Sequence, residues 1–224
     1  RNPGANDQEL VKVTDTILQT YTSSIDPCLL SGKFLVLHRI LSSIRRYTQD
    51  RVIIVSNFTS TLNLLQRYCV RQKFPFLRLD GRTKADVRSK MVNEFNSDSG
   101  SDHLGKQPFV FLLSSKSGGV GLNLIGANRL VLFDSDWNPA TDRQAMARIH
   151  RDGQLKPCFI YRLLLVGSMD EKIYQRQITK IGLSDSLMSN ETAKDNDVAT
   201  SSDTFSQEEL RDVFGYHPNT TCLT

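Results

Sequence analysis

Short hydrophobic runs alternate along the chain with longer segments in which apolar residues recur every three or four positions. The short runs are rich in β-branched and aromatic residues, which is typical of buried strands. Strands are therefore expected at residues 51–56, 76–79, 109–113, 130–133 and 159–166. The alternation of strands with helices predicts an α/β fold, in which a mostly parallel sheet is covered by helices on both faces.

The segments between these runs have the apolar spacing of amphipathic helices. We expect helices at residues 7–22, from 31 to about 44, and at 59–71, 83–95, 139–152 and 169–181. Thr83 is expected to cap the helix that follows it. The helix that begins after Ser31 carries an apolar stripe made of Phe34, Leu37, Ile40, Leu41 and Ile44.

The helix expected at residues 139–152 has the best-defined start. Asn138 is a suitable N-cap, and Pro139 occupies the first helical position, where its missing N–H costs nothing. Asp142 complements the positive end of the helix dipole. Gly153 is the expected stop.

Three polar side chains recur along this helix. Gln144, Arg148 and Arg151 fall at positions i, i+4 and i+7, so at about 100° per residue they share one face. Two guanidiniums and an amide on one face suit the binding of an anionic group. The alternative is an ordinary solvated face, or pairing of the arginines with acidic residues of the same domain.

Small polar residues stand where two of the strands end. Ser56 and Asn57 follow the first apolar run, whereas Ser114, Ser115 and Lys116 follow the third and lead into a glycine-rich turn at 118–121. The carboxyl ends of parallel strands meet at one edge of a sheet, where exposed backbone N–H groups commonly bind phosphate or other ligands. The alternative is that these hydroxyls only satisfy N–H groups of the turns.

Composition narrows the class of protein. The chain has 224 residues, of which 39% are hydrophobic and 23% charged, as in ordinary soluble proteins. It has no apolar stretch of membrane-spanning length and no signal-peptide pattern, so no membrane partner is expected. The four cysteines form no C-x-x-C pair and the four histidines have no metal-ligand spacing. We therefore expect reduced thiols in a cytosolic or nuclear protein, with no zinc.

The charge is unevenly distributed. The net charge is +4, but residues 185–224 hold two basic and eight acidic residues, which leaves 26 basic against 16 acidic residues, or +10, in residues 1–184. Such a basic body suits a polyanionic partner such as nucleic acid, although a basic surplus can also serve solubility. We expect a linker helix within residues 1–30, a lobe at 31–184 and a largely disordered acidic tail at 185–224, with a possible short helix at 206–214.

Three strings within residues 118–154 carry a family resemblance. They are G-G-x-G-x-N-L, D-x-D-W-N-P and Q-x-x-x-R-x-x-R-x-G-Q. Together they resemble motifs V and VI of superfamily-2 ATPases, in the SWI/SNF family of DNA translocases. RNA helicases of that superfamily usually close motif VI with H-R-x-G-R-x-G-R, whereas this chain closes it with R-D-G-Q. The strings S-N-F-T-x-T-L and I-Y-Q-R-Q look most like the recombination-repair branch, whose members work with RecA-type strand-exchange proteins.

The resemblance covers roughly residues 31–184 and implies the C-terminal RecA-like lobe of an ATP-dependent double-stranded-DNA translocase in homologous recombination and DNA repair, in the nucleus. It implies that Arg148 and Arg151 are finger arginines for ATP and that Gln144 couples the cleft to lobe movement. The nucleotide-binding positions would be Gly119, Gly121 and Asn123. The DNA-contacting positions would be Ser56, Asn57, Ser114, Ser115, Lys116 and Trp137, although a tryptophan at that place can also simply pack the turn.

The chain has neither a Walker A lysine pattern nor an acidic Walker B pair, which such ATPases need for the phosphates and Mg²⁺. ATP and Mg²⁺ would then be held mainly by the N-terminal lobe of the same protein, and this chain alone should be inactive. Two alternatives stay open. One is a non-catalytic scaffold lobe that binds a recombinase or chromatin partner, and the other is the C-terminal lobe of an RNA helicase.

Overall fold

The computed structural model of the chain describes residues 31–97, 107–117 and 122–189. The helix expected at 7–22, most of the polar loop after residue 97, and the short helix expected at 206–214 lie outside the described residues. The chain divides into two compact units, residues 1–48 and 49–224. In the first unit, α2 (Gly32–Tyr47) buries four residues of its expected stripe, whereas Ile40 is half-buried.

The second unit is built on a five-stranded sheet, and all four strand pairings in it are parallel. The expectation of a parallel α/β fold is therefore confirmed. In the order β2-β3-β1-β4-β5, the strands span Phe76–Leu79, Val110–Ser114, Val52–Ser56, Arg129–Leu132 and Phe159–Arg162. The central strands β1 and β3 end in register, with Ser56 opposite Ser114, so polar residues of both reach the same edge.

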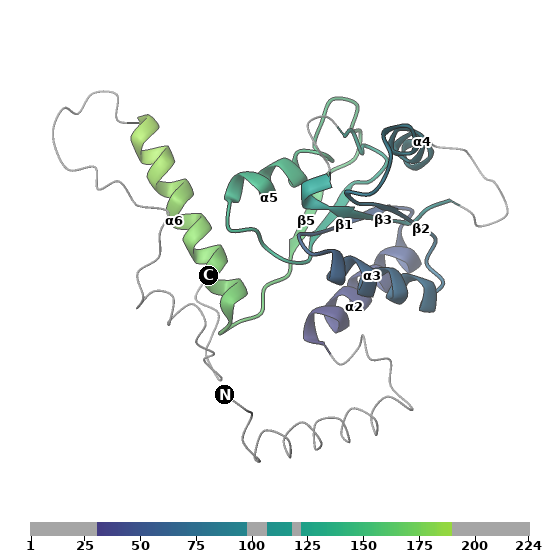
Figure 1. The fold of residues 1–224 in the computed structure, drawn as a ribbon, viewed down its shortest axis with the longest axis horizontal. Coiled ribbons are helices and arrows are strands. Elements are labelled where there is room, and N and C mark those ends of the chain that lie inside the picture. The colour runs from purple at the N-terminus through teal and green to yellow at the C-terminus, as the bar shows by residue number, and fades with distance from the viewer. Residues whose placement is uncertain (1–30, 98–106, 118–121, 190–224) are drawn as a thin grey trace, which may run out of the picture. The chain divides into compact units, whose positions relative to one another are not determined.

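Helices cover both faces of this sheet, and every residue of β1 and β3 is buried. Figure 1 shows α3 (Thr59–Arg71) on one face and α4 (Ala85–Asn96) with α5 (Pro139–Met146) on the other. Alternate residues of β1 face opposite ways, so Ile53 and Val55 join the core cluster that includes Phe95 of α4 and Ala145 of α5. The apolar face of α3 is formed by Leu62, Leu65, Tyr68 and Cys69.

Several helix and strand limits differ from expectation. Thr83 does not cap α4, because its hydroxyl accepts a hydrogen bond from the backbone N–H of Asp80 (3.2 Å) and Lys84 occupies the N-cap position. Strand β5 is shorter than expected because its ladder with β4 ends where the N–H of Leu163 bonds to the carbonyl of Leu132 (3.0 Å).

The last helix, α6 (Met169–Ser189), is longer than the 169–181 expected from the sequence. No proline occurs between Pro157 and Pro218 to end it. The rest of the acidic tail lies outside the described residues. Within the residues that the structure describes, no helix combines the length and apolar character needed to cross a membrane.

Candidate functional site

The carboxyl edge of the sheet is organised by a carboxylate that no sequence argument had singled out. Asp134 follows β4 and is buried. Its Oδ2 accepts a hydrogen bond from the hydroxyl of Ser56 (2.5 Å), and its Oδ1 accepts one from the backbone N–H of Asn57 (2.7 Å). The hydroxyl of Ser115 in turn donates to the side-chain oxygen of Asn57. The structure thus brings together Ser56, Asn57 and Ser115, as predicted, around a residue that was missed.

This arrangement gives the hydroxyls of Ser56 and Ser115 partners within the lobe. Ser56, Ser114 and Ser115 are all buried, whereas Asn57 is half-buried. A buried carboxylate needs hydrogen-bond donors, and one donor to Asp134 is the hydroxyl of Ser56, which lies 78 residues earlier in the chain. The signal for Asp134 was its place after a buried strand, at the start of the D-x-D-W-N-P string.

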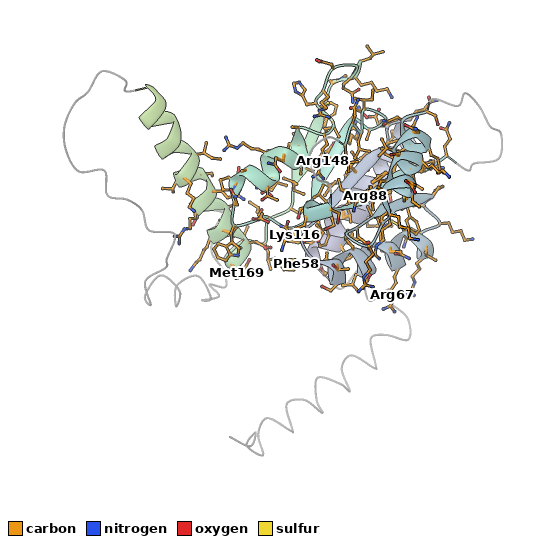
Figure 2. All side chains as sticks on the ribbon, turned by 45° about the horizontal axis from the view of Figure 1, so that its top comes forward. Phe58, Arg67, Arg88, Lys116, Arg148 and Met169 are labelled. Carbon is orange, nitrogen blue, oxygen red and sulfur yellow. The ribbon has the colours of Figure 1, made fainter. Side chains whose placement is uncertain are left out.

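Lys116 lies in a single 3₁₀ turn, η2 (Ser115–Ser117), which we call the serine turn, and its side chain is exposed. Two guanidiniums hold the backbone on either side of it. Arg88 of α4 donates from Nη1 to the carbonyl of Ser117 (3.1 Å), and Arg148 donates from Nη2 to the carbonyl of Ser115 (3.4 Å). Figure 2 shows Arg88, Lys116 and Arg148 around this turn. Arg88 lies in none of the motifs quoted above, so the sequence did not indicate this contact.

The expectation that Gln144, Arg148 and Arg151 share one helical face is wrong. Helix α5 begins as predicted, with Oδ1 of Asn138 accepting from the N–H of Ala140 (3.0 Å), but it ends at Met146. The backbone N–H groups of Arg148 and Ile149 then donate to the carbonyls of Ala145 and Met146 (both 3.3 Å), which are three residues earlier rather than four, as in a 3₁₀ turn. Residues 147–154 therefore form a turn, which we call the arginine turn.

The three side chains consequently have different environments. Gln144 and Arg151 are exposed, whereas Arg148 keeps only 7% of its surface exposed. Burial lowers the pKa of Arg148. Gly153, with φ of 95°, allows the chain to reverse at the end of the arginine turn rather than at the end of the helix.

The loop before β4, residues 122–128, is hydrogen-bonded to the arginine turn. The N–H of Leu124 donates to the carbonyl of Arg148 (3.1 Å). The carbonyl of Asn123 accepts a hydrogen bond from the side-chain amide of Asn96 (2.7 Å). The side-chain oxygen of Asn123 is buried and has no hydrogen-bond partner among the described residues. The other two predicted nucleotide-binding residues, Gly119 and Gly121, lie outside the described part of the chain.

Trp137 lies on the turn between β4 and α5 and is 42% exposed, so it does not serve only to fill the core. The turn is shaped by its neighbours, because Oδ1 of Asp136 accepts from the N–H of Asn138 (2.8 Å). Among the residues the structure describes, no group of three or more His, Cys, Asp or Glu side chains lies close enough together to hold a metal ion.

A buried polar network joins α5 to α6. Asp142 was expected only to complement the helix dipole, but its Oδ2 pairs with Arg162 (2.7 Å) and accepts from the amide of Gln177 on α6 (2.9 Å). Arg162 also donates to the oxygen of Gln177 (2.9 Å) and stacks over the ring of Tyr174 (4.5 Å). We call these residues the α5–α6 network; its only sequence signal was the I-Y-Q-R-Q string.

Comparison with protein families matches residues 32–153 to the helicase conserved C-terminal domain. Among curated relatives, Protein CHROMATIN REMODELING 25 of Arabidopsis thaliana is 51% identical over 188 residues, which are 84% of this chain and 20% of the relative. DNA repair and recombination protein RAD54 of Oryza sativa subsp. japonica is 48% identical, over 84% of this chain and 18% of the relative. DNA repair protein rhp54 of Schizosaccharomyces pombe is 47% identical, over 87% of this chain and 21% of the relative.

The chain thus spans about a fifth of the length of the curated relatives that it matches. Among solved structures, the C-terminal part of the Fun30 ATPase domain resembles it with a TM-score of 0.61 and 35% sequence identity. That likeness covers 76% of this chain and 54% of the other.

Proposed function

The chain belongs to the helicase conserved C-terminal domain family, in its SWI/SNF branch, and we propose that it is the second motor lobe of an ATP-dependent translocase on double-stranded DNA. We further propose that the whole protein acts in the nucleus, in homologous recombination and DNA repair. Its partners would be duplex DNA, the N-terminal RecA-like lobe of the same protein and a RecA-type strand-exchange recombinase. The names of the relatives, which refer to DNA repair, recombination and chromatin remodelling, support this proposal.

One hydrogen bond between the two turns gives the proposal its main structural support. Arg148 stands in the arginine turn and donates to the carbonyl of Ser115 in the serine turn (3.4 Å). In the proposed motor, the arginine turn faces ATP and the serine turn faces DNA. A direct bond between the two turns would let closure of the lobe on ATP change its grip on a DNA strand.

At the nucleotide, the exposed Arg151 would reach across the cleft to the γ-phosphate, with Arg148 beside it and Gln144 coupling the cleft to lobe movement. Such arginines stabilise the charge of the transferring phosphoryl group, which is worth roughly 10³ to 10⁵ in rate. The nucleotide would also meet Gly119, Gly121 and Asn123. The side-chain oxygen of Asn123 has no hydrogen-bond partner among the described residues, but it is buried, so a ligand could donate to it only after the side chain turns outward.

ATP and Mg²⁺ would be held mainly by the N-terminal lobe. The described residues do not offer a carboxylate cluster for a divalent cation. Bound Mg²⁺ would neutralise phosphate charge, and the role of this lobe is to add the guanidiniums. The 224-residue chain alone should therefore bind nucleotide poorly and hydrolyse none.

The DNA surface would consist of Ser56, Asn57, Ser114, Ser115, Lys116 and Trp137. The exposed Lys116 and Trp137 are suited to direct contact with the strand, and Lys116 to a phosphate. The buried serines would act by fixing the shape of the edge, since the hydroxyls of Ser56 and Ser115 already have partners. Contacts of this kind read no base sequence.

A second candidate is a scaffold lobe that binds a recombinase or chromatin partner without catalysis. The internal bonds of Ser56 and Ser115 favour it, because each gives a motif residue a structural task. The intact set of Gln144, Arg148 and Arg151 counts against it, because a scaffold would not need all three side chains.

The test compares ATP turnover by the full-length protein and by the 224-residue chain, each with duplex DNA, single-stranded DNA or RNA. We expect turnover only by the full-length protein, with duplex DNA as the best activator. Turnover by the chain alone would contradict the half-site proposal. Stimulation by RNA but not by duplex DNA would favour the RNA helicase alternative, and no stimulated turnover at all would favour the scaffold.

A further inference from the structure

The side-chain amide of Gln154 lies among backbone carbonyls from two separate segments. Its Nε2 donates to the carbonyl oxygens of Ile125 (3.2 Å), Ala127 (2.8 Å) and Ile149 (3.2 Å). Its Oε1 accepts the backbone N–H of Lys156 (3.0 Å). Because a glutamine amide has two hydrogens for these three acceptors, at least one hydrogen is shared. The amide is therefore fully engaged inside the lobe.

The two segments joined in this way are the loop 122–128 and the arginine turn. Direct backbone bonds between them are few: the N–H of Leu124 donates to the carbonyl of Arg148 (3.1 Å). The N–H of Gln154 closes the arginine turn on itself by donating to the carbonyl of Arg151 (3.0 Å). Gln154 thus bonds by its backbone to the carbonyl of Arg151 and by its side chain to the loop.

The loop 122–128 is anchored on its other side as well. The side chain of Asn96, at the end of α4, donates to the carbonyl of Asn123 (2.7 Å) and accepts from the N–H of Gly126 (2.9 Å). A Cβ at Gly126 would lie only 2.3 Å from the carbonyl oxygen of Phe95, so the backbones are in close contact. The loop is therefore a fixed support, and Gln154 is the side chain that ties the arginine turn to it.

We propose that Gln154 is a positioning residue, whose amide sets the orientation of the arginine turn so that Arg148 and Arg151 meet the transferring phosphate in one defined geometry. This inference rests on the proposed function of those two arginines. It also gives a physical sense to the R-D-G-Q ending. The ending H-R-x-G-R-x-G-R has a charged arginine at the position of Gln154. In this chain the neutral amide of Gln154 donates hydrogen bonds to three backbone carbonyls instead.

Gln154→Leu keeps the approximate size of the side chain and removes its donors and acceptor. A shift of about 1 Å in a phosphate-contacting group can cost about 100-fold in rate. In the full-length protein we therefore expect the duplex-stimulated kcat to fall roughly 30- to 100-fold, with the KM for ATP changed less than about threefold. Gln154→Lys, which offers donors to the same carbonyls, should restore kcat to within about fivefold of the wild type.

A second measurement follows the geometry directly. Amide hydrogen exchange in Gln154→Leu should be faster at Leu124 and at the backbone amide of position 154, which lie on the two joined segments, and unchanged in the strands. Gln49→Leu, which changes an exposed glutamine far from the arginine turn in sequence, is the matched control and should alter neither exchange nor turnover.

The inference is overturned if exchange at Leu124 and Gln154 is unchanged in Gln154→Leu. It is also overturned if kcat stays within about threefold of the wild type, or if it falls only in proportion to the folded fraction and Gln154→Lys does not restore it. Failure of the proposed function looks different, because the wild-type protein itself would then show no DNA-stimulated turnover. The exchange experiment would still decide whether Gln154 fixes the two segments.

Discussion

The two arginines of the arginine turn should separate catalysis from stability when each is replaced by alanine. Both are proposed to act on the γ-phosphate, yet Arg151 is exposed and Arg148 is 7% exposed. Arg151→Ala should therefore lower ATP turnover of the full-length protein with little effect on folding. Arg148→Ala should lower turnover and also destabilise the lobe.

The magnitudes follow from the environment of each side chain. Arg148→Ala removes a hydrogen bond from a charged group to the carbonyl of Ser115, worth about 1.5–3 kcal/mol, and the long distance of 3.4 Å favours the lower half of that range. It also removes buried methylene groups, each worth about 0.8 kcal/mol. The cost of burying the guanidinium, which also lowers its pKa, offsets part of these gains, so we expect a net loss of about 1–2 kcal/mol in the free energy of unfolding and a Tm lower by about 2–8 °C. Arg151→Ala should cost no more than about 0.5 kcal/mol.

The assay measures DNA-stimulated ATP turnover and thermal unfolding in the same preparations, with Arg143→Ala, an exposed arginine of α5, as the matched control. Turnover should fall about 100-fold or more in both variants, the scale of lost charge stabilisation in a transition state. Duplex DNA affinity should be retained by Arg151→Ala. The reasoning is refuted if Arg151→Ala keeps near-normal turnover, or if Arg148→Ala unfolds at the wild-type temperature.

Three further predictions concern the rest of the lobe. Gly126→Ala should destabilise the lobe by at least about 2 kcal/mol in denaturant unfolding, because its Cβ would lie 2.3 Å from the carbonyl oxygen of Phe95; wild-type stability would show that the loop can move away. Burial alone would raise the pKa of Asp50, but hydrogen bonds from Arg129, Asn128 and Lys156 outweigh it and hold that pKa below its usual value. The stability that the ionised Asp50 contributes is therefore present above its unfolded pKa of about 3.9 and is lost as pH falls through its folded pKa. The difference in unfolding free energy between the wild type and Asp50→Asn should accordingly shrink in acid. A difference that does not depend on pH down to acid unfolding would contradict this. Finally, duplex DNA should bind weakly, without sequence preference and with affinity falling steeply with salt, and Lys116→Glu should weaken it in a titration; a flat salt response would mean that the DNA surface is misassigned.

Sequence patterns were sufficient for the features that depend on local chemistry. The apolar runs predicted the five strands of the described sheet, and the Asn138-Pro139 pair predicted the start of α5. The meeting of Ser56 and Ser114 at one edge also followed from parallel pairing alone. The domain limits and the roles of the site residues remain predictions.

Features that depend on distant partners could not be predicted in this way. Ala147, Arg148 and Ile149 continue an acceptable helical pattern, but the carbonyl of Arg148 bonds to Leu124 rather than to a later turn of helix. The partner of Ser56 is Asp134, on a different strand end. The bonds of Gln154 likewise reach carbonyls 27 and 29 residues earlier in the chain. In each case a tertiary contact decides what local propensity leaves open.

The α5–α6 network connects α6 to α5 and through α5 to the arginine turn. Helix α6 has 21 residues, so at 1.5 Å per residue it is about 30 Å long. Its first half is tied to α5 through Asp142, Arg162 and Gln177, and α5 runs directly into the arginine turn. If the proposed ATP cycle rotates α5 by about 10°, the part of α6 beyond Gln177, which is about 18 Å long, would move its far end by about 3 Å. In the proposed motor, the end of α6 would therefore change position once in each nucleotide cycle.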